Sequence, residues 1–181
     1  MSILLGLDPS PLRIGWAYVD LETGAPARCG TQMFAKTDDG LLDPRSVRDA
    51  LRAIDLYTLD DIAVVYVETG FIGPNRRGSA HHMEALGQCV QAASRRWTRA
   101  VIQRIAPAEW RKACGLKGNT PKTDVMEAAR ARALEESPTG YIAAQLIAEL
   151  QEHGQDAADA LMIATAGWTI NQRIITGQNT A

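Results

Sequence analysis

The sequence predicts an α/β protein in which a mixed five-stranded sheet is flanked by helices. Three strand-like runs follow one another closely in the first 35 residues, which is typical of an antiparallel meander. A nearly unbroken apolar run over residues 62–68 has the composition of a central strand that is buried on both faces. Beyond that run, segments with helical spacing of their apolar residues alternate with one more strand. This order of elements places the chain in the α/β class.

The N-terminal third contains the predicted meander and one helix. The run "SILLGL" (2–7) is apolar, "RIGWAYVD" (13–20) places its large apolar residues on one face, and "RCGTQMFA" (28–35) follows the turn "LETGAPA". A helix is predicted to begin after Asp43, because an aspartate followed by a proline suits the N-cap and the first position of a helix. Its apolar stripe consists of Val47, Leu51 and Ile54.

The rest of the chain predicts two more strands and four helices. The strand 62–68 leads into the Gly/Pro-rich loop "TGFIGPNRRGS", and a helix from about residue 80 to 97 follows, with Met83, Leu86, Val90, Ala93 and Trp97 at helical spacing. Residues 100–106 form the fifth strand. Thr120 and Pro121 are predicted to cap the next helix, and further helices cover 136–153 and 155–172. We expect one domain over 1–175 and a flexible tail over 176–181, since neither a repeat nor a linker interrupts the pattern.

The composition excludes several classes of protein. With 46% hydrophobic and 22% charged residues among its 181, the chain has the composition of a globular protein rather than a disordered one. It has neither the roughly 18 consecutive apolar residues of a membrane span nor the pattern of a signal peptide. Cys29, Cys89 and Cys114 are widely spaced and odd in number, which favours reduced thiols over disulfides or a zinc site. We therefore expect a cytoplasmic protein that does not associate with membranes.

The net charge of −2 conceals an uneven distribution of charge. Residues 76–122 contain ten Lys or Arg and only two acids, so this segment carries +8 and the remainder carries −10. Such a division predicts a basic face beside an acidic centre, which is the charge pattern of a nucleic-acid-binding protein.

Four acids are the candidate ligands of a metal ion. Asp8 and Glu68 end strongly apolar strand runs, and carboxyl ends of neighbouring strands are where ligands gather in α/β sheets. Asp156 and Asp159 lie three apart in "HGQDAADALMIA" (153–164), so they share one face of a helix. The helix macrodipole explains the first of them more easily than the second, because its effect fades within one turn. Alanines around them allow a close approach to the sheet, and four converging acids require compensation by hard divalent cations such as Mg²⁺ or Mn²⁺.

Four motifs resemble those of one known family. The stretches "ILLGLDPSPLRIGWAYVD", "VVYVETGF", "APAEWRKACGLKGNTPK" and "QDAADALMIA" are similar, in order and spacing, to the motifs of the RuvC-like Holliday junction resolvases of the ribonuclease H-like superfamily. The resemblance covers roughly residues 3–126 and 154–170. It implies a ribonuclease H-like fold, with Asp8, Glu68, Asp156 and Asp159 as catalytic metal ligands. It also implies two Mg²⁺ ions per active site, with Mn²⁺ accepted as well.

The resemblance also implies a substrate and an assembly. Family members are homodimers that cut two strands of a four-way DNA junction symmetrically and leave 5′-phosphate and 3′-hydroxyl ends. The helix 80–97 would then supply much of the dimer interface, although its apolar stripe is equally consistent with a place in the core. The expected DNA-binding residues are Phe71, Arg76, Arg77, Arg111, Lys112, Lys117 and Lys122.

Three of these DNA contacts have specific alternatives. The positive charge of Lys122 opposes the helix macrodipole at the start of its helix. This arrangement suits a site where the lysine and the helix N-terminus bind one phosphate together, and the alternative is an ordinary surface lysine. The family's second basic residue matches either Arg111 or Lys112. Phe71 matches an aromatic residue that inserts near the junction crossover, and its alternative is a loop phenylalanine packed on the core.

The sequence departs from the cellular resolvases in three respects. Its pI of about 5.9 is low for a DNA enzyme, the segment 131–153 is longer than the usual link, and the loop after Glu68 is rich in glycine and arginine. These features favour a divergent, phage-encoded member with broader specificity for branched DNA. The alternatives are a related nuclease acting on RNA precursors and a non-catalytic branched-DNA-binding protein. An actin-like ATPase needs two such domains, and this chain is too short for them.

Overall fold

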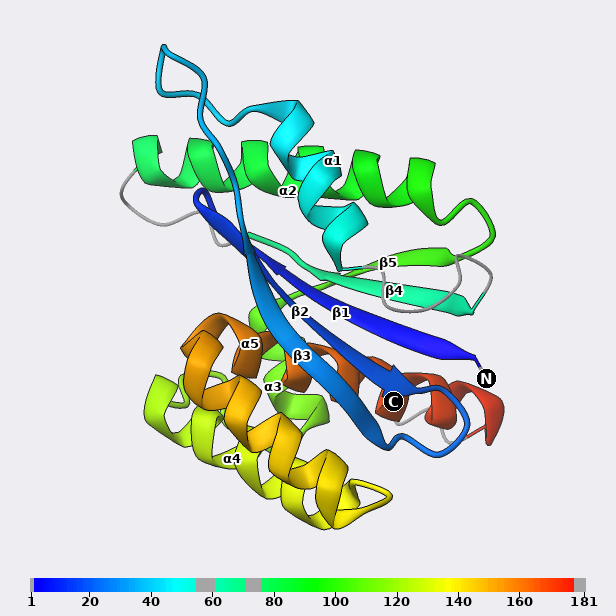
Figure 1. The fold of residues 1–181 in the computed structure, drawn as a ribbon. Helices are drawn as coiled ribbons and strands as arrows, with labels where there is room; N and C mark the ends of the chain where they lie inside the picture. The colour runs from blue at the N-terminus through cyan, green and yellow to red at the C-terminus, as the bar shows by residue number, and fades with distance from the viewer. Residues whose placement is uncertain (1, 55–60, 71–75, 178–181) are drawn as a thin grey trace.

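The protein forms one mixed five-stranded sheet, as predicted, in the strand order β3-β2-β1-β4-β5 (Figure 1). The computed structural model describes residues 2–54, 61–70 and 76–177. Strands β1, β2 and β3 pair antiparallel, whereas β4 and β5 run parallel to β1. The strands are β1 (Ile3–Pro9), β2 (Arg13–Asp20), β3 (Pro26–Met33), β4 (Ile62–Glu68) and β5 (Val101–Ile105).

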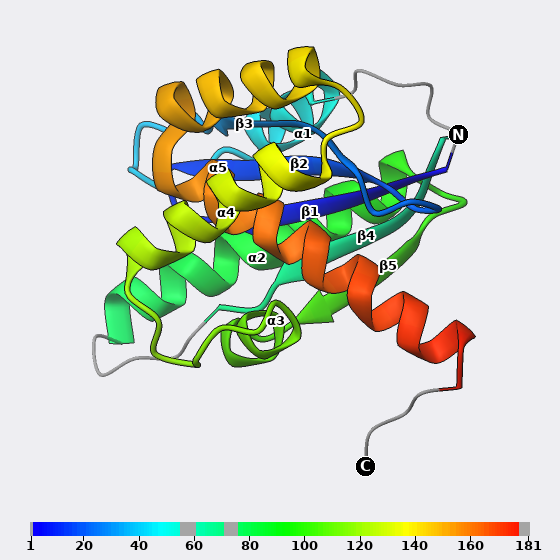
Figure 2. The same cartoon turned by 90° about the horizontal axis from the view of Figure 1, so that it is seen from below.

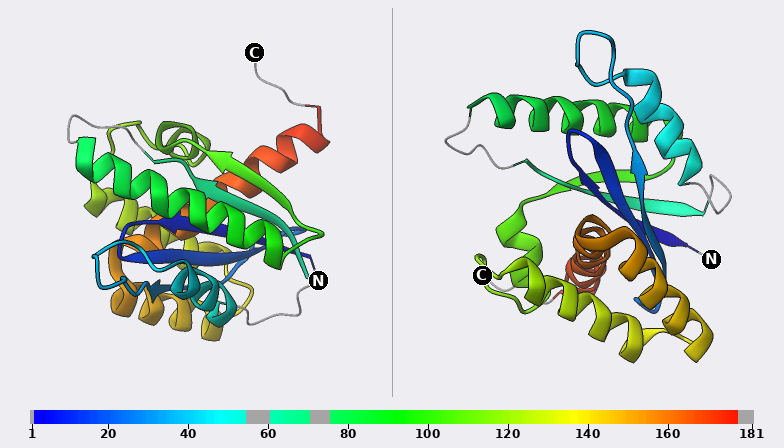
Figure 3. Two further views of the ribbon diagram at one scale, coloured as in Figure 1. Left: turned by 90° about the horizontal axis from the view of Figure 1, so that it is seen from above. Right: turned by 60° about the vertical axis from the view of Figure 1, so that its left-hand side comes forward.

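Helices cover both faces of this sheet. On one face lie α1 (Pro44–Ala53) and α2 (Arg76–Arg96); on the other lie α3 (Pro107–Ala113), α4 (Lys122–Glu136) and α5 (Gly140–Ile175). Figure 3 shows the sheet between these two helical layers. Because successive strand residues point to opposite faces, the sheet contributes to two separate cores, one under α1 and α2 and one under α3, α4 and α5.

The apolar stripe of α2 belongs to the core. Leu86, Cys89, Ala93 and the following Trp97 are buried against the sheet, while Met83 is 41% exposed and was wrongly assigned to the stripe. Packing within one chain therefore accounts for this apolar stripe. The dimer interface that the family resemblance implies for the helix 80–97 stays a prediction.

A glycine divides α5 into two segments with different roles. Gly154 has a φ of 66°, outside the helical region, and lies between the two helices predicted over 136–153 and 155–172. The first segment packs beside α4 and along β3, and the second crosses beneath β2 and β1 (Figure 2). The break at Gly154 thus determines where the residues of the last motif meet the sheet.

The long link 131–153 covers an edge of the sheet. Glu149 is buried, forms an ion pair with Arg28, and accepts a hydrogen bond from the backbone N–H of Cys29 at 2.9 Å. Gln145 donates a further hydrogen bond to the same carboxylate at 3.1 Å. An edge strand with unpaired backbone groups invites association, so this link protects β3.

Several boundaries differ from the prediction. The third strand begins at Pro26 rather than 28, because Asp20 caps the turn through the N–H of Thr23 at 2.8 Å and the reversal is completed earlier. Helix α2 begins at Arg76, four residues early, and α3 was not predicted because a seven-residue helix with one buried side chain shows no periodicity. The hydroxyl of Thr120 donates to the carbonyl of Lys117 instead of capping α4, whose N-cap is Pro121.

Candidate active site

Neighbouring parallel strands bring Asp8 and Glu68 together. Strands β1 and β4 are paired with Leu7 opposite Val67, which places the two acids one step further along at adjacent carboxyl ends. Their carboxyl groups are hydrogen-bonded to each other. The expectation that the first and fourth runs lie side by side is therefore confirmed.

The second segment of α5 brings Asp156 and Asp159 to the same place. Its alanines at 157, 158 and 160 are completely buried, and the glycines of the strands complete the fit. A Cβ on Gly6 would collide with the backbone of Ala160 and Ala164, and a Cβ on Gly15 would collide with the carbonyl of Asp156. Small residues on both sides thus allow the helix to lie directly on β1 and β2.

Burial and mutual repulsion disfavour ionisation in this cluster. The pKa of Asp8 is raised well above its usual range, first by burial and then by the charge and hydrogen bond of Glu68, with smaller effects of Asp159 and Asp156. The pKa of Asp159 is raised to about 6, mainly by burial and also by Glu68. A hydrogen bond from Gln155 at 2.9 Å and the charges of Lys122 and Arg111 oppose that rise.

The donor set fits hard divalent cations. Carboxylate oxygens are the ligands that such ions prefer, and a dication would offset the repulsion that raises the pKa of Asp8. The four acids do not form a ready-made cage, because no three acids, histidines or cysteines in the described ranges are gathered closely enough to hold an ion. One reason is visible in Asp156, which is ion-paired with Arg13.

The structure separates the two candidates for the basic residue of α3. Arg111 lines a cavity of about 530 Å³ together with Glu68, Thr69 and His82, whereas Lys112 is exposed and is not part of its lining. The guanidinium of Arg111 lies 4.9 Å from the Trp110 ring centre and donates to the carbonyl of Gly118 at 2.9 Å, so it is fixed in direction.

The other predicted DNA contacts divide into three groups. Lys122 begins α4 and acts on Asp159 through its charge, while Lys117 is exposed in the preceding turn. Arg76 and Arg77 begin α2, although their side chains lie outside the described part. Phe71 also lies outside the described residues, so its insertion at a crossover stays a prediction.

The basic segment does not form one continuous face. Arg95 and Arg96 end α2 and line a cavity of about 270 Å³ with Arg48 and Arg52 of α1. Arg111 and Lys122 belong to the opposite helical layer, beside the acids. The expectation of a single basic face is therefore wrong, because the segment crosses the sheet between α2 and α3.

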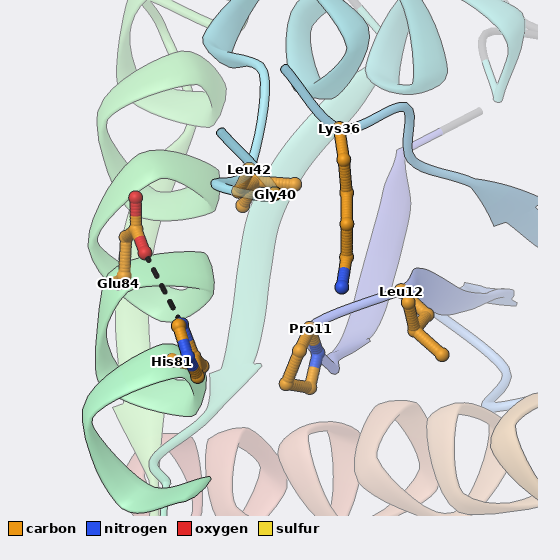
Figure 4. A pocket seen from close by; sticks show the side chains of 7 residues that line it. All are labelled: Pro11, Leu12, Lys36, Gly40, Leu42, His81 and Glu84. Carbon is orange, nitrogen blue, oxygen red and sulfur yellow. Dashed lines mark ion pairs between the residues drawn. The ribbon is translucent and has the colours of Figure 1, made fainter. Parts of the chain in front are cut away.

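The histidines occupy surroundings that the sequence left unassigned. His81 lies 3.8 Å from a carboxylate oxygen of Glu84 and lines a cavity of about 260 Å³ beside the β1–β2 turn (Figure 4). In this view Lys36 extends toward Pro11 and Leu12. His153 is partly buried, with its Nδ1 3.2 Å from the hydroxyl of Thr31.

Two further expectations can be compared with the described residues. All three cysteines are free thiols, and burial raises the pKa of Cys89 and of Cys114 to about 12. Among the described helices, none has the length and apolar character needed to cross a membrane.

Sequence reasoning missed Arg13. Its partner Asp156 is 143 positions away, so no local pattern could connect them. The available signal was a basic residue five positions after Asp8, at the start of the next predicted strand.

The arrangement of the sheet and its two helical layers is shared with several solved structures. No family model and no curated protein matches the sequence. RuvC from Thermus thermophilus in complex with a Holliday junction substrate matches with a TM-score of 0.59 and 18% identity, over 95% of this chain and 96% of that chain. A second T. thermophilus RuvC structure gives 0.55 and 19%, over 94% and 95%.

A more distant resolvase shares the same architecture. The yeast mitochondrial Holliday junction resolvase Ydc2 matches with a TM-score of 0.53 and 11% identity, over 99% of this chain and 85% of that chain. These similarities extend over nearly the whole chain. The protein therefore has the RuvC fold, as the motifs in its sequence predicted.

Proposed function

We propose that this protein is a metal-dependent endonuclease that cuts four-way DNA junctions by symmetric paired nicks. The observation that carries the proposal is that Asp8 and Glu68 end adjacent strands of a chain with the fold of RuvC, and that Asp156 and Asp159 of α5 lie close enough to act on Asp8 through their charges. One of the RuvC structures with this fold holds a Holliday junction substrate. Symmetric cutting requires two such sites, so the proposal includes a homodimer.

The residues have separate tasks in this reaction. Two Mg²⁺ ions held by the four acids would supply an activated water and stabilise the leaving 3′ oxygen. Asp8 and Glu68, anchored on adjacent strands, offer carboxylates whose positions are set by the sheet, while Asp156 and Asp159 offer theirs from the first turns after Gly154. Arg111 and Lys122 place positive charge beside the acids, where they would bind the phosphates that flank the cut.

Cleavage of matched substrates tests the proposal. The purified protein is incubated in Mg²⁺ with a synthetic four-way junction, a flap, plain duplex and structured RNA, and the products are separated on a denaturing gel. We expect symmetric 5′-phosphate products from the junction, and none in EDTA. Asp8→Asn, Glu68→Gln, Asp156→Asn and Asp159→Asn should each abolish cutting while junction binding in a gel shift is retained or strengthened, because less negative charge then faces the phosphates.

Each unexpected result identifies a different function. Preferential cutting of structured RNA would establish a ribonuclease that processes precursors. Tight junction binding without cutting in any divalent metal would establish a non-catalytic branched-DNA-binding protein. Full activity of Asp8→Asn, or activity in EDTA, would refute the assignment of the site.

A further inference from the structure

Arg13 contacts the acidic cluster directly, and the proposed chemistry gives it no task. Its Nε is ion-paired with Oδ2 of Asp156. The Arg13 side chain is 44% exposed and that of Asp156 only 16%, so the pair lies at the rim of the site with the guanidinium on the solvent side. A cation in this position is accessible to a ligand from outside.

The pair can separate only by movement of the side chains. Asp156 follows the break at Gly154, and its carbonyl lies so close to Gly15 that a Cβ there would collide with it. The backbone of Asp156 is thus held against β2, the strand that also carries Arg13. Rotation of the Asp156 carboxylate or of the long arginine side chain is sufficient to break the contact.

Metal binding and the Arg13 contact compete for the same oxygen atoms. In the present arrangement no three acids, histidines or cysteines of the described residues are grouped as a metal cage. A hard dication that takes Asp156 as a ligand must draw its carboxylate away from the guanidinium. Once that happens, Arg13 is an excess positive charge next to the ions and requires another anion.

The surroundings of Arg13 indicate which anion that is. Beside it lies a cavity of about 420 Å³, lined by Ser10, Pro11, Leu12, Arg13, Met33 and Asp156. In the sheet, β2 lies on one side of β1, whereas β4 and β5, which lead to the Arg111 cavity, lie on the other. A nucleic-acid strand that passes over the acids would meet Arg111 on one side and Arg13 on the other. A guanidinium binds phosphate through two parallel hydrogen bonds.

We propose that Arg13 is a positioning residue that exchanges partners, holding Asp156 in the metal-free protein and a DNA backbone phosphate in the metal-loaded complex. The proposal rests on the metal-dependent nuclease function above. It predicts that removal of the guanidinium has opposite effects on two affinities, because Arg13 hinders the metal and helps the DNA.

The experiment compares Arg13→Gln with Arg52→Gln. Arg52 is a matched control, since it pairs with Asp49 at 3.4 Å on the exposed surface of α1. Mn²⁺ binding without DNA is measured by electron paramagnetic resonance, and junction binding is measured in Ca²⁺, without cutting. We expect Arg13→Gln to bind Mn²⁺ several-fold more tightly and the junction several-fold more weakly, with a salt slope about 0.9 smaller. Arg13→Lys should recover part of the junction affinity, and Arg52→Gln should match the wild type in Mn²⁺ binding.

The outcomes separate this inference from the function on which it rests. Unchanged or weaker Mn²⁺ binding by Arg13→Gln overturns the competition, and unchanged junction affinity overturns the phosphate contact. A lowered melting temperature with both affinities weakened would show that Arg13 is merely structural, and the proposal would be wrong. A wild-type protein that binds no Mn²⁺ contradicts the nuclease function itself.

Discussion

Among the single residues of the site, the acids lower the stability of the metal-free protein. Asp8 and Asp159 are half-buried beside Glu68, and loss of solvent contact is the largest cause of the raised pKa of each. A carboxyl group with a raised pKa stabilises the folded state when it is protonated, and that stabilisation is lost as the pH rises through the folded-state pKa. At neutral pH, these carboxyl groups should therefore lower the free energy of unfolding of the metal-free protein.

Asp159 gives this effect a defined pH window. Its pKa rises from 3.8 to about 6 on folding, so its contribution is complete below pH 3.8 and disappears as the pH passes 6. One pKa unit corresponds to about 1.4 kcal/mol, which sets an upper limit of roughly 3 kcal/mol. In EDTA, we expect the melting temperature of the wild type to fall relative to that of Asp159→Asn between pH 4 and 7. At about 2–4 °C per kcal/mol, calorimetry resolves this difference.

Magnesium provides the control for this prediction. At pH 8, addition of Mg²⁺ should raise the melting temperature of the wild type more than that of Asp159→Asn, because the ion replaces the missing proton. A difference between the two proteins that stays constant from pH 4 to 7 would show that Asp159 has an ordinary pKa in the folded protein.

At the scale of secondary-structure elements, the site depends on how closely α5 lies on the sheet. The helix carries two of the acids, and it packs on β1 and β2 through Gly6, Gly15 and its own alanines. Close packing of this kind tolerates no additional atoms, because interiors have few voids. The spacing between helix and strand therefore determines whether the carboxylates of both can reach one ion.

Gly6→Ala tests the importance of this spacing. The new methyl group would meet the backbone of Ala160 and Ala164 rather than a movable side chain, so α5 must shift. We expect a loss of about 1–3 kcal/mol in urea unfolding, together with weaker Mn²⁺ binding. The matched control is Gly87→Ala in α2, where a Cβ meets nothing within 4 Å and the helix should gain roughly 0.5–1 kcal/mol. Equal stabilities of the two variants would show that the packing of α5 on β1 can accommodate the added methyl group.

At the scale of the whole molecule, the positive charge is divided between the two helical layers. Arg111 and Lys122 lie near the acids, whereas Arg95 lies in the last turn of α2, beside α1. A strand of DNA that reaches the acids passes the first pair. The near-neutral total charge therefore conceals positive side chains beside the acids, and these are the side chains that we expect to meet DNA phosphates.

The salt dependence of junction binding measures this division. Each phosphate contact that is lost should lower the slope of log K against log salt by about 0.9 on duplex arms. We expect that reduction for Lys122→Ala and for Arg111→Ala, and little change for the charge-matched Arg95→Ala. Fluorescence anisotropy in Ca²⁺ over a series of salt concentrations gives the slopes. Equal slopes for all three variants and the wild type would contradict the placement of the DNA beside α3 and α4.

Local sequence patterns were sufficient to predict the class of fold and to single out four acids as candidate metal ligands. Apolar runs, alternation and helical spacing are properties of a few neighbouring residues, so the five strands and most of the helices were predicted from them. Asp8 and Glu68 were located by their position at the ends of buried strands, and Asp156 and Asp159 by their spacing on a helix of alanines. The short helix α3 escaped prediction because seven residues contain too little periodicity.

The partners of these acids and the positions of the charges around them depend on how distant elements pack together. The contact of Arg13 with Asp156, the choice of Arg111 rather than Lys112, and the packing of the link 131–153 on β3 each join residues that are distant in the chain or ambiguous in register. A local pattern indicates which face of an element is apolar, but it does not specify which polar side chain from another element meets it. That choice depends on the packing of the complete sheet and its two helical layers.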